Sequence, residues 1–296
     1  GMWKANDITN IAEESLYADE VILARNTRYQ RIVLTAWKDD VRLFLNGHLQ
    51  FSSRDEYRYH EALVHPGLAA LPGARRVLVL GGGDGLAVRE VLRYPGVQRV
   101  DLVDLDVEMT TLFATHPRLA ALNGRSLSNP RVRVVNDDAF VWLDRNPAEL
   151  YDFIVVDFPD PSNYAVGKLY TVAFYRLVAK HLSRDGLAVV QSTSPLFARQ
   201  SYWSIVRTLQ QAGLATSPYH LYVPSFGEWG FVLAGTGAPY RQPAVLPAGL
   251  RYLTTRELPQ LFTFSLDMLP VSAEPNRLND QALVRYYEEE WSRINR

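Results

Sequence analysis

The spacing of hydrophobic positions changes near residue 72. Before it, short runs alternate apolar and polar residues, as at 31–34 and 41–45, and Asn46-Gly47 is typical of a hairpin turn. After Pro72-Gly73, apolar runs rich in β-branched residues alternate with helical stretches, which is the pattern of βαβ units. The runs expected as parallel strands are Val77–Leu80, Val100–Val103, Val132–Val135, Phe153–Val156 and Leu187–Val190. The pattern predicts an α/β fold with a doubly wound, mostly parallel sheet, preceded by a small antiparallel β unit.

A helix is predicted just before the two parts of the chain meet. Ser53 and Glu56 match a capping box, which predicts a helix that runs through Val64 and ends before Pro66. We expect residues 1–66 to form a β-rich unit with one helix, and residues 67–296 to form the α/β domain with its C-terminal tail.

The end of the α/β domain departs from the parallel pattern. Segments 219–223 and 229–233 flank Pro224-Ser225-Phe226-Gly227, which predicts two antiparallel strands. The proline-containing tail from residue 239 is expected to close with a helix over 280–294.

Composition excludes several kinds of function. Lys and Arg number 31 against 32 Asp and Glu, so no excess positive charge would attract a nucleic acid backbone. The absence of cysteine excludes a disulfide scaffold, a thiolate zinc site and a cysteine nucleophile. No run of 18 apolar residues occurs, and Gly1-Met2-Trp3-Lys4 does not begin a signal peptide. These features predict a globular chain that neither spans a membrane nor is exported.

Carboxylates follow the predicted parallel strands. The strand at 77–80 leads into Gly81-Gly82-Gly83-Asp84-Gly85, and the next three lead into Asp104, Asp137-Asp138 and Asp157 with Asp160. Ligands of open α/β sheets bind at the carboxyl ends of the strands. A single aspartate in a loop is usually only solvated, but four consecutive strands that end in aspartates indicate a binding site.

The glycine loop and the aspartates of the next two strands suit a nucleoside. Position 86 is Leu, so the loop lacks the third glycine of a dinucleotide fingerprint and fits a bare nucleoside better than a phosphate. Asp104, 21 residues after Gly83, has the spacing of an acidic residue that binds ribose hydroxyls. Asp138 could accept from the exocyclic amine of adenine, and it could equally cap a helix over 139–146.

The remaining carboxylates suit a cation. An aspartate at position 84 would repel the carboxylate of S-adenosylmethionine and attract a cationic aminopropyl group. The pair Asp157 and Asp160 could hold a diamine, whose one ammonium must be anchored and whose other nitrogen must lose a proton before it attacks carbon.

An ordered set of segments over roughly residues 20–290 resembles one known family. The segments are YQRIVL at Tyr29, LNGHLQFSSRDEYRYHEALVHP from Leu45, LVLGGGDGLAVREVLRY from Leu78, VDLD at Val103, NDDAF at Asn136, DFPDP at Asp157, KLYTVAFY from Lys168 and EWGFVLA at Glu228. They resemble the polyamine aminopropyltransferases, the spermidine synthase family. The resemblance implies an S-adenosylmethionine-dependent methyltransferase-like Rossmann fold.

One branch of the family matches further. The segment EPNRLNDQALVRYYEEEW near the C-terminus resembles the branch in which this domain follows a multi-span membrane region. No such region lies in this chain, and Gly1 before Met2 fits a catalytic domain taken from a longer protein. The resemblance implies a cytoplasmic location, with a tether to the cytoplasmic membrane if the chain is an excised domain, and a homodimer is expected.

The family implies a role for each aligned residue. Asp157 matches the catalytic aspartate, and Gln191 is expected to support the site. The residues implied to bind the donor, decarboxylated S-adenosylmethionine, are Gln30, Asp84, Asp104, Asp138 and Ala139. The residues implied to bind the amine acceptor are Tyr59, His60 and Asp160.

The acceptor half departs from the family pattern. Ser162-Asn163-Tyr164 replace a Gly-Pro-rich stretch, Lys168 replaces an acidic residue, and Phe226 stands where a tyrosine commonly meets the acceptor. The identity of the amine therefore stays open.

The predicted function is aminopropyl transfer from decarboxylated S-adenosylmethionine, as co-substrate, to a diamine or polyamine, with putrescine to spermidine the leading case. The reaction releases 5'-methylthioadenosine and needs neither a metal nor a permanently bound cofactor. Two alternatives are a methyltransferase that uses intact S-adenosylmethionine and a non-catalytic protein that binds polyamines or nucleosides. Asp84 argues against the first, and Asp157 against the second.

Overall fold

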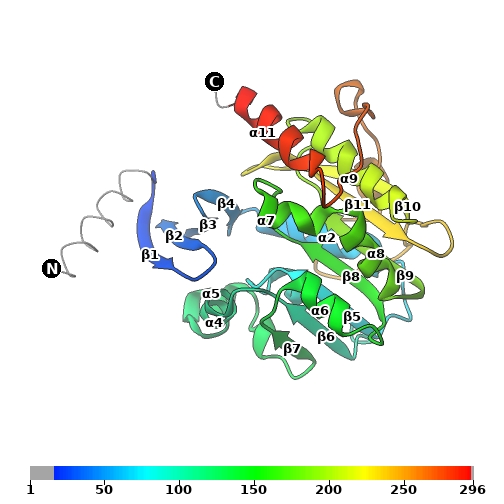
Figure 1. Cartoon of the computed structure of the whole chain (residues 1–296). Coiled ribbons are helices and arrows are strands. Elements are labelled where there is room, and N and C mark those ends of the chain that lie inside the picture. The colour runs from blue at the N-terminus through cyan, green and yellow to red at the C-terminus, as the bar shows by residue number, and fades with distance from the viewer. Residues whose placement is uncertain (1–16, 295–296) are drawn as a thin grey trace. The chain divides into compact units, whose positions relative to one another are not determined.

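The computed structural model describes residues 17–294, and the chain divides into two compact units between Tyr57 and Arg58 (Figure 1). The prediction about Gly1 to Lys4 lies outside the described residues. Across residues 17–294, every helix is too short or too polar to cross a membrane.

The first unit is the predicted antiparallel sheet, with strand order β1-β2-β3-β4. Its strands are β1 (Glu20–Asn26), β2 (Arg31–Trp37), β3 (Asp40–Leu45) and β4 (His48–Ser52). Asn46 and Gly47 both have positive φ, 50° and 81°, as a tight hairpin between β3 and β4 requires. The predicted turn is confirmed.

The predicted capping box at Ser53 is wrong. The Ser53 hydroxyl accepts from the N–H of Val41 (2.8 Å) and donates to Asp40 (3.1 Å), so it joins the loop to β3. The helix α2 (Glu56–Leu68) begins three residues later.

The second unit contains one sheet of order β10-β11-β9-β8-β5-β6-β7. The five predicted parallel strands pair in parallel, and β10 and β11 are antiparallel, as predicted. The strands are β5 (Arg76–Gly81), β6 (Arg99–Val103), β7 (Val132–Val135), β8 (Tyr151–Asp157), β9 (Leu182–Gln191), β10 (Ala215–Val223) and β11 (Gly227–Gly235).

Helices connect these strands and cover the sheet. In the view of Figure 1, α6 and α8 lie in front of the sheet, and their apolar side chains join one core with β8 and β9. The α-helices after α2 are α3 (Leu86–Val91), α4 (Val107–Thr115), α5 (Pro117–Leu122), α6 (Ala139–Arg145), α7 (Tyr164–Gly167), α8 (Val172–Lys180), α9 (Arg199–Gln211), α10 (Leu258–Leu261) and α11 (Ala282–Ile294). The 3₁₀ helices are η1 (Ser126–Ser128), η2 (Lys168–Tyr170) and η3 (Leu266–Met268).

Helix α2 does not end before Pro66, as the sequence predicted, but continues to Leu68. Proline has no N–H, so the carbonyl of Ala62, four residues earlier, loses its helical donor. The buried hydroxyl of Tyr219 donates to that carbonyl instead (2.7 Å). A strand residue far along the chain thus makes the proline tolerable inside the helix.

The order of the strands determines where a ligand can bind. The chain runs from β5 outward to β6 and β7, and then returns to place β8 on the other side of β5. Such a reversal opens a crevice at the carboxyl ends of the two central strands. Gly81 at the end of β5 pairs with Asp157 at the end of β8, so the glycine loop and the DFPDP segment meet there.

Candidate active site

The glycine loop approaches two aspartates too closely for a larger residue. Gly81, Gly82 and Gly85 have positive φ, between 65° and 77°. A β-carbon at Gly81 would lie 2.4 Å from the carbonyl oxygen of Asp157, and one at Gly83 would lie 2.7 Å from the carboxylate of Asp104. The loop therefore packs closely against the backbone of Asp157 and the carboxylate of Asp104, which only glycine permits.

Asp157 lies partly buried at the end of β8, where the hydroxyl of Tyr59 donates to its Oδ1 (2.5 Å). Its Oδ2 faces the glycine loop, because a β-carbon at Gly82 would lie 3.5 Å from it. Burial, aided by the negative charge of Asp84, raises the pKa of Asp157 to about 6, although His60 and the Tyr59 hydrogen bond act to lower it. This carboxylate is a stronger base than an exposed aspartate.

Tyr59 and His60 are held at this edge by helix α2. Their rings meet edge to face at 4.9 Å, and the Tyr59 ring also contacts Phe231 (5.1 Å) and Phe226 (6.4 Å). On the same helix, Glu61 accepts hydrogen bonds from three consecutive backbone N–H groups, those of residues 251–253. Phe226 therefore adds a ring, and no hydroxyl, beside Tyr59.

Asp84 belongs to the glycine loop, and Asp104 lies against it. Asp104 accepts from the N–H groups of Gly83 (3.0 Å) and Asp106 (2.9 Å), and burial raises its pKa to about 6 against the effect of these bonds. Asp84 is 9% exposed and accepts from the N–H of Leu86 (2.9 Å). The charge of Asp84 raises the pKa of both Asp104 and Asp157, so Asp84 lies close enough to interact electrostatically with both carboxylates.

Asp138 caps helix α6, which is one of the two roles that the sequence left open. Its Oδ1 accepts from the N–H groups of Phe140 (2.9 Å) and Val141 (3.2 Å), beside the buried Ala139. Its Oδ2 binds the ammonium of Lys168 (2.6 Å). Burial opposes ionisation, but Lys168 and the helix N–H groups outweigh it and lower the pKa of Asp138. The role of Asp138 and Ala139 in adenine binding stays a prediction.

Asp160 lies beyond Pro159 and is surrounded by donors. Its Oδ1 accepts from the side-chain amide of Gln191 (3.1 Å), and its Oδ2 accepts from the hydroxyls of Thr193 (3.1 Å) and Tyr287 (3.0 Å). Gln191 therefore contacts Asp160 directly, and its expected role as support of the site stays a prediction.

The structure brings Asp84, Asp104, Asp157, Tyr59 and His60 into one neighbourhood. Gln30 belongs to the N-terminal unit, where its N–H donates to the Thr27 hydroxyl (3.1 Å) in the turn between β1 and β2. Its predicted contact with the donor stays a prediction.

Three residues contact the carboxylates of the site although the sequence pattern does not predict these contacts: Lys168, Thr193 and Tyr287. In the sequence, Lys168 is only a departure from the family pattern. Tyr287 lies more than a hundred residues from Asp160, and neither it nor Thr193 belongs to a local pattern that indicates a contact.

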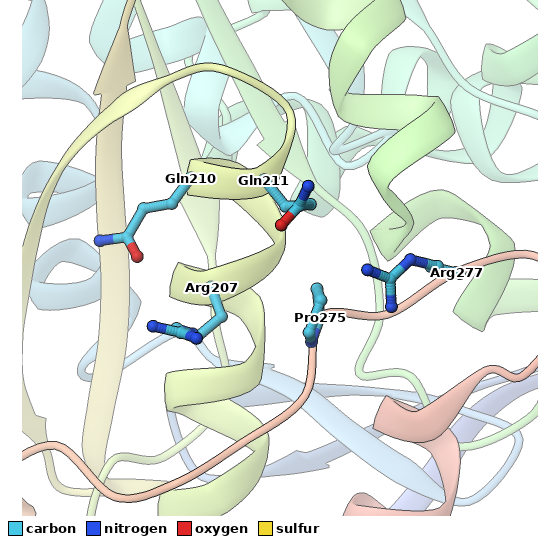
Figure 2. A pocket seen from close by; sticks show the side chains of 5 residues that line it. All are labelled: Arg207, Gln210, Gln211, Pro275 and Arg277. Atoms are coloured by element: carbon cyan, nitrogen blue, oxygen red, sulfur yellow. The ribbon is translucent and has the colours of Figure 1, made fainter.

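A hollow of about 390 Å³ lies away from these carboxylates, on α9 and the segment before α11 (Figure 2). It is lined by Arg207, Gln210, Gln211, Pro275 and Arg277. Its two charged residues are cations, which would repel a diamine, so this hollow does not suit the predicted acceptor.

Comparisons with known proteins agree with the resemblance. The model of the family described as "Spermine/spermidine synthase domain" matches residues 56–238. A polyamine aminopropyltransferase of Leptospira interrogans is 56% identical over 287 residues, which are 97% of this chain and 57% of that protein. Polyamine aminopropyltransferase 2 of Ralstonia nicotianae is 54% identical over 297 residues, which are 100% of this chain and 58% of that protein.

A solved structure shares the fold. It is a spermidine synthase in complex with the transition-state analogue AdoDATO, with a TM-score of 0.75 and 22% identity, and the match covers 83% of this chain and 85% of that one. The predicted Rossmann-type fold is confirmed. The chain spans less than three fifths of the length of the two curated relatives. The homodimer, the membrane-linked branch and the cytoplasmic location stay predictions.

Proposed function

The chain belongs to the spermine/spermidine synthase domain family, and on that premise we propose that it transfers the aminopropyl group of decarboxylated S-adenosylmethionine to a diamine or polyamine. Putrescine is the leading acceptor and spermidine the product. The names of the related aminopropyltransferases support the reaction type, and the likeness to a spermidine synthase structure supports the fold.

The observation that carries the proposal is the pair formed by Asp157 and Tyr59. A carboxylate with its pKa raised to about 6, hydrogen-bonded at 2.5 Å to a tyrosine, lies at the switch point of the sheet. Perturbed carboxylates in such crevices are typical of catalytic bases.

The chemical step is an in-line displacement. The lone pair of the acceptor nitrogen forms a bond to the aminopropyl carbon attached to sulfur, while the carbon–sulfur bond breaks and its electrons pass to the sulfonium. One proton leaves the acceptor ammonium before the attack. The leaving 5'-methylthioadenosine is neutral, and the new secondary nitrogen carries the positive charge as an ammonium. Because the sulfonium already activates the carbon, orientation of the two substrates can supply several kcal/mol of the barrier reduction.

The proton of the acceptor is the main chemical obstacle. An alkyl ammonium has a pKa near ~10 and a free aspartate one near ~4, so direct transfer would cost about 6 units, or roughly 8 kcal/mol. With the pKa of Asp157 at about 6, the gap falls to about 4 units, or roughly 5 to 6 kcal/mol. Asp157 therefore serves as the proton acceptor and as the anchor that orients the attacking nitrogen, with Tyr59 fixing its Oδ1.

The other carboxylates divide between the two substrates. Asp104 and Asp138 bind the ribose and the adenine, while Asp84 attracts the aminopropyl ammonium of the donor. Asp160, three residues beyond Asp157, receives the far ammonium of the acceptor. Tyr59 lies at the Asp157 end of that pair, because its hydroxyl donates to Asp157 (2.5 Å).

The test is one incubation of the purified chain with each donor, decarboxylated and intact S-adenosylmethionine, and a panel of diamines. We expect 5'-methylthioadenosine only with the decarboxylated donor and an amine. Release of S-adenosylhomocysteine would show a methyltransferase, and binding of donor and amine with no product would show a protein that only binds them.

A further inference from the structure

The carboxylate of Asp160 is held by three uncharged donors from separate parts of the chain. Gln191 ends β9, Thr193 follows it, and Tyr287 belongs to α11 (Ala282–Ile294). These three donors fix the orientation of the carboxylate.

Thr193 holds its position at an energetic cost. It is fully buried and has a φ of 55°, a left-handed conformation that is rare for β-branched residues. The surroundings enforce it: its N–H donates to Oε1 of Gln191 (3.2 Å), and its carbonyl accepts from the N–H of Gly230 (2.6 Å). Such strain persists where the resulting geometry has a use, and here it brings the Thr193 hydroxyl to Asp160.

Helix α11 is fixed as firmly as the strand end. The carboxylate of Glu290 accepts from the N–H groups of Gln200 (2.6 Å) and Ser201 (3.0 Å) and from the Ser201 hydroxyl (2.6 Å), so it caps the start of α9. Figure 1 shows α11 in red along α9, with its first turn near α7. One turn before Glu290, Tyr287 therefore has a defined place, with its ring 5.8 Å from that of Trp291.

Tyr287 lies at one end of the pair of acceptor carboxylates. The hydroxyl of Tyr59 donates to Oδ1 of Asp157 (2.5 Å), whereas the hydroxyl of Tyr287 donates to Oδ2 of Asp160 (3.0 Å). Tyr59 thus lies by the reacting end, and Tyr287 by the far end.

We propose that Tyr287 closes the acceptor site behind Asp160 and thereby determines acceptor length, so that the enzyme prefers a short diamine whose far ammonium stops at Asp160. This inference rests on the proposed aminopropyl transfer. A longer polyamine would have to pass the place that the Tyr287 ring and hydroxyl occupy.

The test compares kcat/KM for putrescine and for spermidine, measured by release of 5'-methylthioadenosine, in the wild-type chain, Tyr287→Ala, Tyr287→Phe and Tyr286→Ala. Tyr286 is the neighbouring tyrosine on α11, and its hydroxyl accepts from the N–H of Glu274 (3.3 Å), so it is a matched control. Tyr287→Ala should raise the spermidine-to-putrescine ratio at least tenfold. Tyr287→Phe keeps the ring, so it should leave that ratio unchanged and raise the KM for putrescine several-fold with little change in kcat.

The outcomes distinguish a failure of the proposed aminopropyl transfer from a failure of the proposed role of Tyr287. No turnover of either amine by the wild-type chain would overturn the proposed function itself. With an active wild type, an unchanged ratio in Tyr287→Ala, or an equal loss for both amines, would overturn the role in acceptor length. If Tyr287→Ala fails to fold, an unchanged KM for putrescine in Tyr287→Phe would overturn it as well.

Discussion

At the scale of single residues, Asp157 combines two opposing requirements. Its ionised form is needed to accept a proton, yet burial and the charge of Asp84 disfavour that form. Its pKa is about 6 in the folded protein, against an ordinary value of 3.8. The stability that this group contributes is therefore fully present below pH 3.8 and is lost as the pH rises through about 6. Above that pH, the charge favours chemistry and disfavours folding.

Replacing Asp157 with Asn should separate these effects. Turnover should fall by about 10²- to 10⁴-fold, the usual contribution of general base catalysis, while the affinity for 5'-methylthioadenosine survives. At pH 8 the variant should also be more stable than the wild type, by up to about 3 kcal/mol, because no charge is buried. Steady-state kinetics, calorimetry and urea denaturation measure these changes, with Asp144→Asn on the exposed side of α6 as control. Near-wild-type kcat would move the base to His60 or Tyr59.

The pH dependence of turnover should report the same carboxylate. Because Asp157 must be ionised to accept the proton, kcat should rise with pH through about 6. The Tyr59 hydrogen bond lowers the pKa of Asp157, so Tyr59→Phe should move the inflection to higher pH. A pH series with saturating substrates checks this, and an inflection that stays in place or moves downward would contradict the assignment.

At the scale of elements, helix α2 depends on a partner from β10. Tyr219→Phe removes the hydroxyl that donates to the Ala62 carbonyl (2.7 Å) above Pro66. A buried carbonyl left without a donor costs about 1–3 kcal/mol, so the free energy of unfolding should fall by that amount. Urea denaturation measures it, and Tyr222→Phe is the control because Tyr222, also on β10, is 52% exposed. Equal stability of the two variants would show that the helix does not need this bond.

The same helix shows how far a sequence pattern can predict structure. The pattern of apolar residues predicted all five parallel strands and the antiparallel pair correctly, because the residues that make a segment a buried strand lie within that segment. The end of α2 and the capping role of Ser53 were predicted wrongly because Tyr219 and Asp40, outside the local window, decide them. Asp157 and Asp160 were predicted as a pair from a short motif, whereas Tyr287 reaches Asp160 only through tertiary packing.

At the scale of the whole molecule, the order of the strands concentrates negative charge. The return of the chain from β7 to β8 brings the ends of β5, β6 and β8 together, and Asp84, Asp104 and Asp157 with them. A chain of net charge −1 thereby has a local site that strongly favours cations. Selection between substrates then follows from charge as much as from shape.

The donor is where this selection can be measured most directly. Decarboxylated S-adenosylmethionine differs from the intact form by one carboxylate, which would lie near Asp84 and be repelled by it. We expect calorimetry to show at least tenfold tighter binding of the decarboxylated form.

Asp84→Asn should reduce that preference, because an asparagine keeps an acceptor for the N–H of Leu86 but carries no charge. Asp185→Asn, an exposed substitution near the start of β9, should leave the preference unchanged. Because the charge of Asp84 also raises the pKa of Asp157, Asp84→Asn should shift the pH inflection of turnover downward as well. Equal affinities of the wild-type chain for the two donors would remove Asp84 from the recognition of the aminopropyl group.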